Sequence, residues 1–278
     1  MVRRNSFSAL RSSTTQQAKL WGLALSAMTV RIGSSSLKRV TPGVDNAGTK
    51  PGGEDKPSKE DMEATKKHKQ EQRQKLYAQM HTCNLWLDYH KNSPSVYDEW
   101  MGIGFTEEEI NKWGLGFCSA CPLSPEHTSL TIPVWFKGKL WDIRHRLIGA
   151  EQGKYRSHLP GLVPPFYNLD AILTSRQVYV VEGEKKTIKC VSCGVPAVIG
   201  YPGIQFFKRI PEILNKYLDS TQQVIFIPDP GTTDKIIEMA QQIKVPCYLV
   251  DLWMKPDDLI LEHGADMFMS AIRMPRPI

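Results

Sequence analysis

No stretch of this 278-residue sequence reaches the roughly 18 apolar residues that a transmembrane helix requires. The longest apolar stretch near the N-terminus, residues 20–30, is short and is interrupted by Gly22, Ser26 and Thr29. Cysteine is also scarce, and six cysteines in a chain of this length do not build a disulfide framework. These absences argue against a membrane partner and against a secreted scaffold, and they favour a reducing, intracellular compartment.

Acidic side chains are absent before Asp45, although this segment is rich in arginine, lysine, serine and threonine. Residues 41–59 consist largely of glycine, proline and lysine and offer too little apolar surface to build a core. We therefore predict a disordered basic tail and linker over residues 1–59. Three interpretations of the first forty residues stay open: an arm that touches nucleic acid, an overlong gene start, or an organellar transit peptide. The first two are compatible with a cytoplasmic protein of a phage or a bacterium.

The charge balance is a weaker indication of function. The net charge is +6 and the pI is about 8.9, so the chain is mildly basic and suited to a polyanionic partner. Many metabolic enzymes have a similar balance, and charge alone does not identify that partner as nucleic acid. With 41% hydrophobic residues, the chain has enough apolar material for one or two domains.

Two helices are expected after the linker. The first covers residues 60–91, with a polar first half and apolar residues at helical spacing in the second half. The second begins at Thr106, which forms a capping-box pattern with Glu109, and it ends at Gly114.

A basic hairpin is expected next, because residues 130–136 and 140–146 are two strand-like stretches joined around a glycine. Aromatic residues alternate with basic ones here, and such a surface binds phosphates while its rings stack on bases. Alternate residues of a strand point to one face, so neighbouring basic positions act together. The candidate nucleic-acid or nucleotide contacts are Arg144, Arg146, Lys154 and Arg156. The alternative is an ordinary solvated hairpin whose aromatic rings belong to the core.

Strands and helices alternate in the last hundred residues. Short apolar stretches predict strands at residues 178–181, 197–199, 224–227 and 247–250, with helix-forming segments between them. This alternation predicts βα units around a mainly parallel sheet. The sequence thus predicts three segments: the tail (1–59), a helical and β-hairpin subdomain (60–176) and an α/β domain (177–278).

Acidic residues stand where these strands end. The first strand leads directly into Glu182 and the third leads to Asp229, and a glycine follows each acid within two residues. Ligands of parallel sheets gather at the carboxyl ends of the strands, where paired carboxylates suit Mg²⁺ or Mn²⁺. Asp257 and Asp258 follow the fourth strand and complete the candidate metal ligands. Each acid alone has a simpler explanation as a helix N-cap or a turn residue.

The cysteines form two CxxC pairs, Cys118 with Cys121 and Cys190 with Cys193. A four-thiolate zinc site combines two such pairs, but the usual spacing between them is about 15–20 residues, much shorter than here. The second pair also lies near the end of an expected helix, where cysteine is more often a small buried residue. We therefore expect no zinc.

Several motifs resemble those of a known domain. VVEGEKK at residues 180–186, GVPAV at 194–198 and GYPG at 200–203 resemble the first half of a TOPRIM domain. FIPD at residues 226–229 resembles its second acidic motif, and KPDDL at 255–259 resembles the closing acidic segment of primase TOPRIM domains.

The region before these motifs resembles the same family. Residues 104–117 are similar to the helical lead-in of bacterial and phage primases, and residues 130–146 with 154–156 resemble the hairpin and basic segment of their catalytic part. The resemblance covers about residues 76–270, and the Glu-Gly motif is its most specific part. It implies an α/β fold, a TOPRIM-type mainly parallel sheet flanked by helices, after a small α+β subdomain with a β-hairpin.

The resemblance also implies a function, namely a primase-like nucleotidyltransferase that makes short RNA primers on single-stranded DNA with Mg²⁺ or Mn²⁺. Glu182 and Asp229 would be catalytic and, with Asp257 and Asp258, would hold the metal ions. The basic hairpin residues would hold the template and ribonucleoside triphosphates. The resemblance adds Lys185 and Lys186 to that basic set.

Two departures weaken the implied activity. Gly231 stands where the family's second motif has an aspartate, and Lys186 stands where many relatives carry an acid. Two alternatives therefore stay open: a TOPRIM nuclease, and a non-catalytic replication accessory protein that binds single-stranded DNA. The sequence shows neither a zinc ribbon nor the phosphate loop of a fused helicase, so we expect a replicative helicase or another replication protein as a partner.

Overall fold

The computed structural model describes residues 59–91, 95–151, 153–159 and 166–278. The predicted tail and linker therefore lie outside the described residues, apart from the last position of the linker, which begins a helix. Residues 57–278 form one compact unit. None of the described helices is both long enough and apolar enough to cross a membrane.

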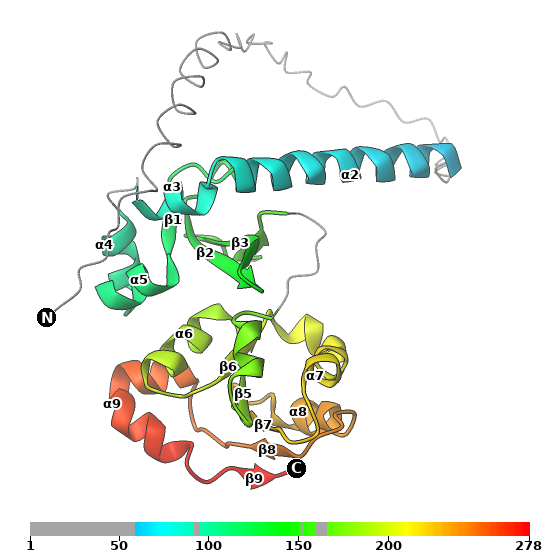
Figure 1. The fold of residues 1–278 in the computed structure, drawn as a ribbon. Helices are drawn as coiled ribbons and strands as arrows, with labels where there is room; N and C mark the ends of the chain where they lie inside the picture. Colours follow the sequence, from blue (N-terminus) through cyan, green and yellow to red (C-terminus); the bar gives the residue numbers. More distant parts are fainter. Residues whose placement is uncertain (1–58, 92–94, 152, 160–165) are drawn as a thin grey trace, which may run out of the picture. The chain divides into compact units, whose positions relative to one another are not determined.

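The first sheet is antiparallel, with its strands in the order β1-β2-β3-β4 (Figure 1). Its strands are β1 (Gly116–Cys118), β2 (Ser129–Phe136), β3 (Lys139–Leu147) and β4 (Tyr155–Ser157). β2 and β3 form the predicted hairpin, and its two turn residues, Lys137 and Gly138, have φ angles of 51° and 69°. Two left-handed residues in succession give a turn whose twist matches that of the strands, which explains the glycine.

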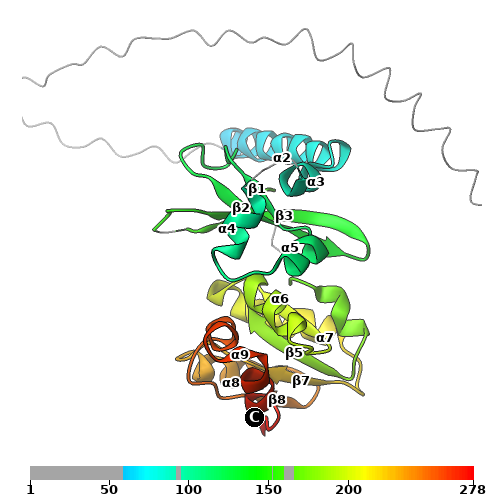
Figure 2. The ribbon, with the colours of Figure 1, turned by 90° about the vertical axis from the view of Figure 1, so that its left-hand side faces the viewer.

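Four helices accompany this sheet: α2 (Lys59–Thr82), α3 (Leu85–Lys91), α4 (Val96–Met101) and α5 (Glu107–Trp113). α4 and α5 pack on β2, whereas α2 and α3 pack on β3 (Figure 2). The capping box is confirmed, because Thr106 Oγ1 accepts from the Glu109 N–H and the Glu109 carboxylate accepts from the Thr106 N–H. Gly114 ends α5 in the left-handed conformation, as expected.

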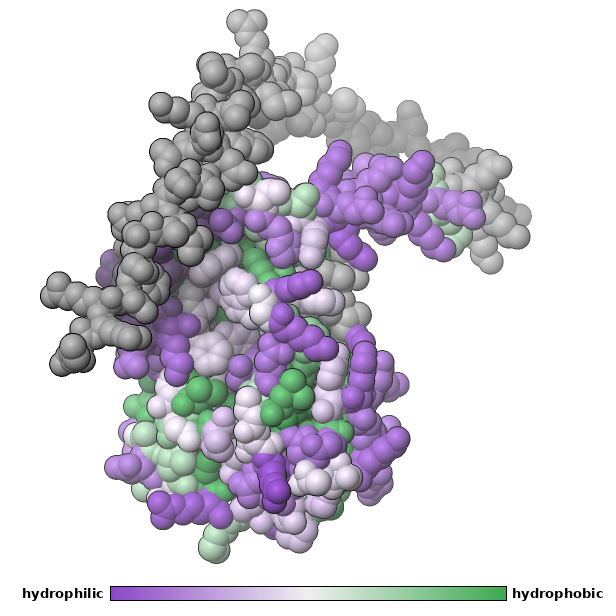
Figure 3. Space-filling view, viewed as in Figure 1, coloured by the Kyte–Doolittle hydropathy of each residue, from purple (hydrophilic) through white to green (hydrophobic). Residues whose placement is uncertain are grey.

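The single helix expected over residues 60–91 is wrong. Asn84 adopts a φ of 47°, which interrupts the helix and separates α2 from α3. The polar first half was predicted correctly, since Met80 is the one buried side chain among those described in α2. Figure 3 accordingly shows a mostly hydrophilic surface along this helix.

The second sheet has five strands in the order β6-β5-β7-β8-β9, and only β9 is antiparallel to its neighbour. Its strands are β5 (Gln177–Glu182), β6 (Val198–Tyr201), β7 (Gln223–Phe226), β8 (Cys247–Leu249) and β9 (Arg276–Pro277). The four parallel strands lie at the predicted positions, within two residues. The two-residue β9 has no counterpart in the sequence pattern.

Helices cover both faces of this sheet (Figure 1). α6 (Glu184–Ser192) and α9 (Pro256–Ala271) pack on one face, around a core that includes Val181, Ile225 and Phe268. The other face is covered by η1 (Leu169–Leu173), η2 (Ile204–Arg209), α7 (Ile210–Tyr217) and α8 (Thr233–Ala240). The predicted fold class is therefore confirmed: a mainly parallel sheet flanked by helices follows a small α+β region with a hairpin.

Two buried histidines lie at the first sheet, His145 on β3 and His158 directly after β4. His145 Nε2 is 3.1 Å from His158 Nδ1, and Ser129 Oγ is 3.0 Å from His145 Nδ1. Burial lowers the pKa of His145 to about 3, with the neighbouring charges adding to the effect, and burial also lowers the pKa of His158. Asp142 on the same strand shows the opposite shift, because burial raises its pKa to about 6.

Stability is therefore expected to fall as the pH drops from 7.5 to 5. Unfolded histidine takes up a proton near pH 6.5, whereas His145 stays neutral in the fold over this range, so the unfolded state binds more protons. The lowered pKa of His158 acts in the same direction. Asp142 opposes this, because the folded state takes up its proton first. We expect a net loss of about 1 kcal/mol or more in urea denaturation, because His145 alone costs about 1.4 kcal/mol for each pH unit below 6.5, and Asp142 offsets only part of this cost. The Asp142→Asn variant should lose more over the same range; equal stability at both pH values would contradict this.

Candidate functional site

Glu182 and Asp229 lie at the same edge of the second sheet. Glu182 is the last residue of β5, and Asp229 follows the end of β7, the parallel neighbour of β5. Burial raises the pKa of Glu182 and the Asp229 carboxylate raises it as well, whereas Lys186 and Lys255 act in the opposite direction. The structure thus brings together the two acids that the sequence placed at strand ends.

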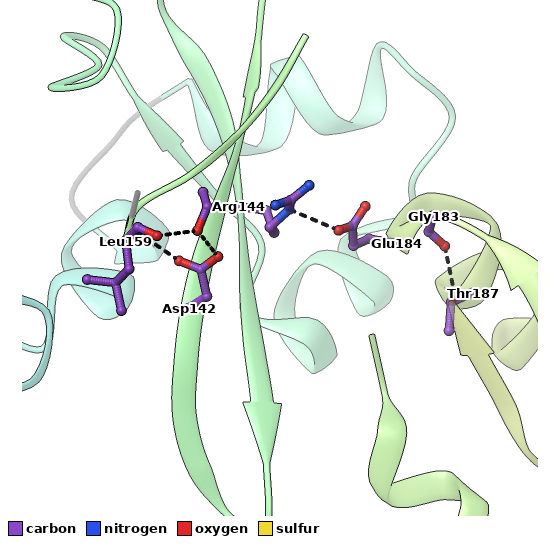
Figure 4. A network of polar contacts seen from close by, with 7 residues as sticks. Asp142, Arg144, Leu159, Gly183, Glu184 and Thr187 are labelled. Atoms are coloured by element: carbon purple, nitrogen blue, oxygen red, sulfur yellow. Dashed lines mark hydrogen bonds and ion pairs between the residues drawn. The ribbon is translucent and has the colours of Figure 1, made fainter. Parts of the chain in front are cut away.

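The turn after β5 depends on close packing against β6. Gly183 adopts a φ of 82°, and Thr187 Oγ1 donates a hydrogen bond of 2.8 Å to its carbonyl oxygen (Figure 4). A Cβ at Gly200 of β6 would lie 2.3 Å from Thr187 Oγ1 and 2.6 Å from the Gly183 oxygen. Glycine at position 200 is therefore what lets α6 begin directly beside β6, with Glu182 at the exposed edge.

Three acids of the site are paired with basic side chains of the chain itself. Lys186 Nζ lies 2.9 Å from Asp229 Oδ2, and Lys185 Nζ lies 3.7 Å from Asp257 Oδ2.

The third pair joins the two sheets. Arg144 of β3 reaches Glu184, the first residue of α6, with 3.2 Å between Nε and Oε1 (Figure 4). Both side chains are about 93% buried, since 7% of each is exposed. Glu184 was quoted in the sequence motif but not expected at the site. This pair places the basic hairpin opposite the acidic strand ends.

A cleft of about 530 Å³ lies where these elements meet. Eight of the ten predicted site residues line it: Arg144, Arg146, Lys154, Glu182, Lys185, Lys186, Asp257 and Asp258. Tyr155, Lys255 and Gln205 also line it, and the sequence motifs had not singled out Lys255 or Gln205 as contacts. Asp229 does not line the cleft itself and reaches it through its bond to Lys186.

Arg156 lies apart from the other basic residues. In the β3–β4 pairing, Tyr155 is opposite Arg146, whereas Arg156 is opposite His145 and so points to the other face. Its guanidinium lies close to Gly153, and it is not among the residues that line the cleft. The expectation that the neighbouring basic positions act together on one face is therefore wrong for Arg156.

The implied metal ion can be tested against these contacts. Asp229 Oδ1 and Asp257 Oδ1 are buried and have no hydrogen-bond partner, which is what a missing cation would leave. Yet the second oxygen of each carboxylate already faces a lysine ammonium. Among the described residues, no group of three or more histidines, cysteines or acids is gathered as a metal site would require. In this arrangement the residues do not fit a divalent cation.

The two CxxC pairs belong to different cores. Cys118 and Cys121 pack with Leu147 beside the first sheet, whereas Cys190 and Cys193 lie on and after α6 beside the second. Cys121 Sγ is 3.6 Å from His145 Nδ1. All four are free thiols in the structure.

The fold resembles that of primase catalytic cores in solved structures. Comparison with solved structures finds this fold with a probability of 1.00. The sequence resemblance to primases is therefore confirmed at the level of the fold. No protein-family model and no curated protein matches the sequence.

Three solved structures illustrate the likeness. The DnaG primase catalytic domain bound to single-stranded DNA has a TM-score of 0.55 and 17% identity, over 74% of this chain and 80% of that one. The Aquifex aeolicus primase, with zinc-binding and RNA polymerase domains, has a TM-score of 0.59 and 14% identity, over 73% of this chain and 62% of that one. The E. coli primase catalytic core has a TM-score of 0.54 and 16% identity, over 73% of this chain and 80% of that one.

Proposed function

We propose that this chain is a primase-like nucleotidyltransferase that joins ribonucleotides into short RNA on a single-stranded DNA template. The observation that carries the proposal is the cleft, in which the basic edge of β3 and β4 faces the acidic strand ends in a primase fold. A solved relative of this fold holds single-stranded DNA, and we extend that property to this chain.

The basic side of the cleft suits the template. Arg146 and Lys154 line it and form no ion pair with an acid of the described residues, so both are available to phosphates. Tyr155 lines the same cleft, is 38% exposed and offers an aromatic face on which a base can stack.

The acidic side suits the reacting groups. Lys185 and Lys186 lie in the first turn of α6, where backbone N–H groups and the helix dipole also favour a phosphate. Glu182 and Asp257 stand beside them in the same cleft. A ribonucleoside triphosphate bound between the lysines and the hairpin would bring its reacting phosphate to these carboxylates, which is why we assign the transfer reaction to this place.

A second candidate function is a non-catalytic protein that binds single-stranded DNA during replication. One observation favours it: Glu184, Asp229 and Asp257 are each already neutralised by a basic side chain. Carboxylates that are already paired with basic side chains are less free to hold the metal ions of a metal-dependent transfer.

DNA binding through the cleft is tested with two arginines of adjacent strands. Replacing Arg146 by alanine should weaken binding to single-stranded DNA about fivefold or more and make the salt dependence shallower by about 0.7 in log–log slope, because one phosphate contact is lost. Replacing Arg156 by alanine removes the same charge outside the cleft and should change the affinity less than twofold. Fluorescence anisotropy across a salt series measures both; equal losses in the two variants would place the interface elsewhere.

A further inference from the structure

The ammonium group of Lys186 stands at the two acids that β5 and β7 bring together. Its Nζ donates a hydrogen bond of 2.9 Å to Asp229 Oδ2, and both side chains are largely buried, with 12% and 14% exposed. The same ammonium acts electrostatically on Glu182. A cation supplied by the chain therefore lies where the strand-end carboxylates gather.

The position of Lys186 on its helix is otherwise unfavourable. It lies in the first turn of α6, where the helix dipole repels a positive charge, and Lys185 precedes it. A charge-assisted hydrogen bond to a partly buried carboxylate offsets that repulsion. The lysine and the aspartate thus hold each other in place across 43 residues of sequence.

We propose that Lys186 is a built-in cation of the acidic site, so that a divalent metal ion binds at Glu182 and Asp229 only when Lys186 is displaced. The ammonium and a metal ion compete for the negative charge of the same carboxylates, and they repel each other at short range. Asp229 Oδ1, which is buried and unpartnered, is the oxygen that a metal ion would take first once the ammonium leaves. The inference goes beyond the proposed function and holds whether or not the chain transfers nucleotides.

The test is Mn²⁺ binding to the full chain, measured by electron paramagnetic resonance at pH 7.5 without nucleic acid or nucleotide. The wild-type chain should bind Mn²⁺ weakly, in the millimolar range or above. Lys186→Met should bind at least about tenfold more tightly, because the competing charge is gone. Lys186→Arg keeps a positive charge at the site and should stay within about twofold of wild type.

Two further variants locate the effect. Lys154→Met removes one positive charge from the same cleft without freeing a carboxylate, and it should leave Mn²⁺ affinity within about twofold of wild type. Adding Asp229→Asn to Lys186→Met should abolish the gain. Because Mn²⁺ then stabilises only the folded state of Lys186→Met, it should raise the Tm of that variant and not of wild type.

The possible results separate clearly. Micromolar Mn²⁺ binding by the wild-type chain would overturn the inference, even if Lys186→Met proved too unstable to purify. An unchanged affinity in folded Lys186→Met, or a gain that survives Asp229→Asn, would overturn it too. Since no DNA or nucleotide is present, none of these results depends on whether the chain is a transferase.

Discussion

Replacing Lys189 by methionine is expected to lower the free energy of unfolding by about 3–5 kcal/mol, the usual cost of removing one partner of a buried ion pair. Lys189 Nζ lies 2.7 Å from Glu109 Oε2 and 2.5 Å from the Gly104 carbonyl oxygen, and the two charged side chains are only 6% and 7% exposed. The ammonium also lies 4.6 Å from the centre of the Phe105 ring. The variant would leave the Glu109 carboxylate buried and unpaired.

The pKa of Glu109 supports this role. Burial alone would raise it, but the hydrogen bonds from Lys189 and Thr106 hold it below its ordinary value. Without Lys189, the buried Glu109 carboxylate would lose its charged partner and would destabilise the folded state. Because Lys189 belongs to α6 and Glu109 to α5, the pair joins the helix that carries the cleft lysines to the capped helix beside the first sheet.

A double variant provides the control. Glu109→Gln combined with Lys189→Met removes both charges, and glutamine retains the capping box with Thr106. We expect the double variant to recover at least about half of the loss, because no buried charge is left unpaired. Urea denaturation at pH 7.5 measures all three variants. A single Lys189→Met variant within about 1 kcal/mol of wild type would show that the pair contributes little.

Primer extension by the purified chain is expected to exceed unaided initiation at least about a hundredfold. Initiation must hold two free nucleotides in register, whereas an annealed RNA brings its 3′-hydroxyl already positioned, which saves much of the entropy cost of the reaction. The paired acids at Asp229 and Asp257 increase the difference, because they leave little free charge to organise two loose substrates. Labelled ribonucleotides, supplied with single-stranded DNA alone or with an annealed short RNA, measure the two rates.

A partner protein is expected to reduce the difference between the rates of primer extension and initiation. A replicative helicase or another replication protein that delivers single-stranded template should raise the rate of initiation and leave extension nearly unchanged. Robust initiation by the isolated chain would contradict this dependence.

The sequence correctly predicted the caps, turns and strands that depend on interactions between residues close together in the chain. The capping box at Thr106 and the turn at Gly138 both appear where the sequence placed them. The alternation of apolar strands and helices gave the parallel sheet, since each βα unit must bury both faces of its strand. The break at Asn84 was missed, because asparagine within a helical pattern gives only a weak stop signal.

The ion pairs at the site could not be predicted from the sequence pattern. Lys186 and Asp229 are 43 residues apart, and their contact depends on how α6 packs beside the second sheet. Arg144 and Glu184 are 40 residues apart, and their contact depends on how the two sheets pack. One signal was present, however. Two lysines at the start of a helix oppose its dipole, which indicates that acidic partners are held nearby. The register of β4, which turns Arg156 away from the cleft, also depends on pairing that the sequence does not specify.

The most direct test of the account is the addition of ribonucleotides to an end-labelled RNA annealed to a longer DNA strand. We expect the wild-type chain, with Mn²⁺ or Mg²⁺, to lengthen the RNA in steps that follow the template. We expect Glu182→Gln to abolish the lengthening while single-stranded DNA binding is retained. An RNA that keeps its length, with wild-type DNA binding intact, would contradict the transferase and favour the non-catalytic protein, and a shortened DNA strand would identify a nuclease instead.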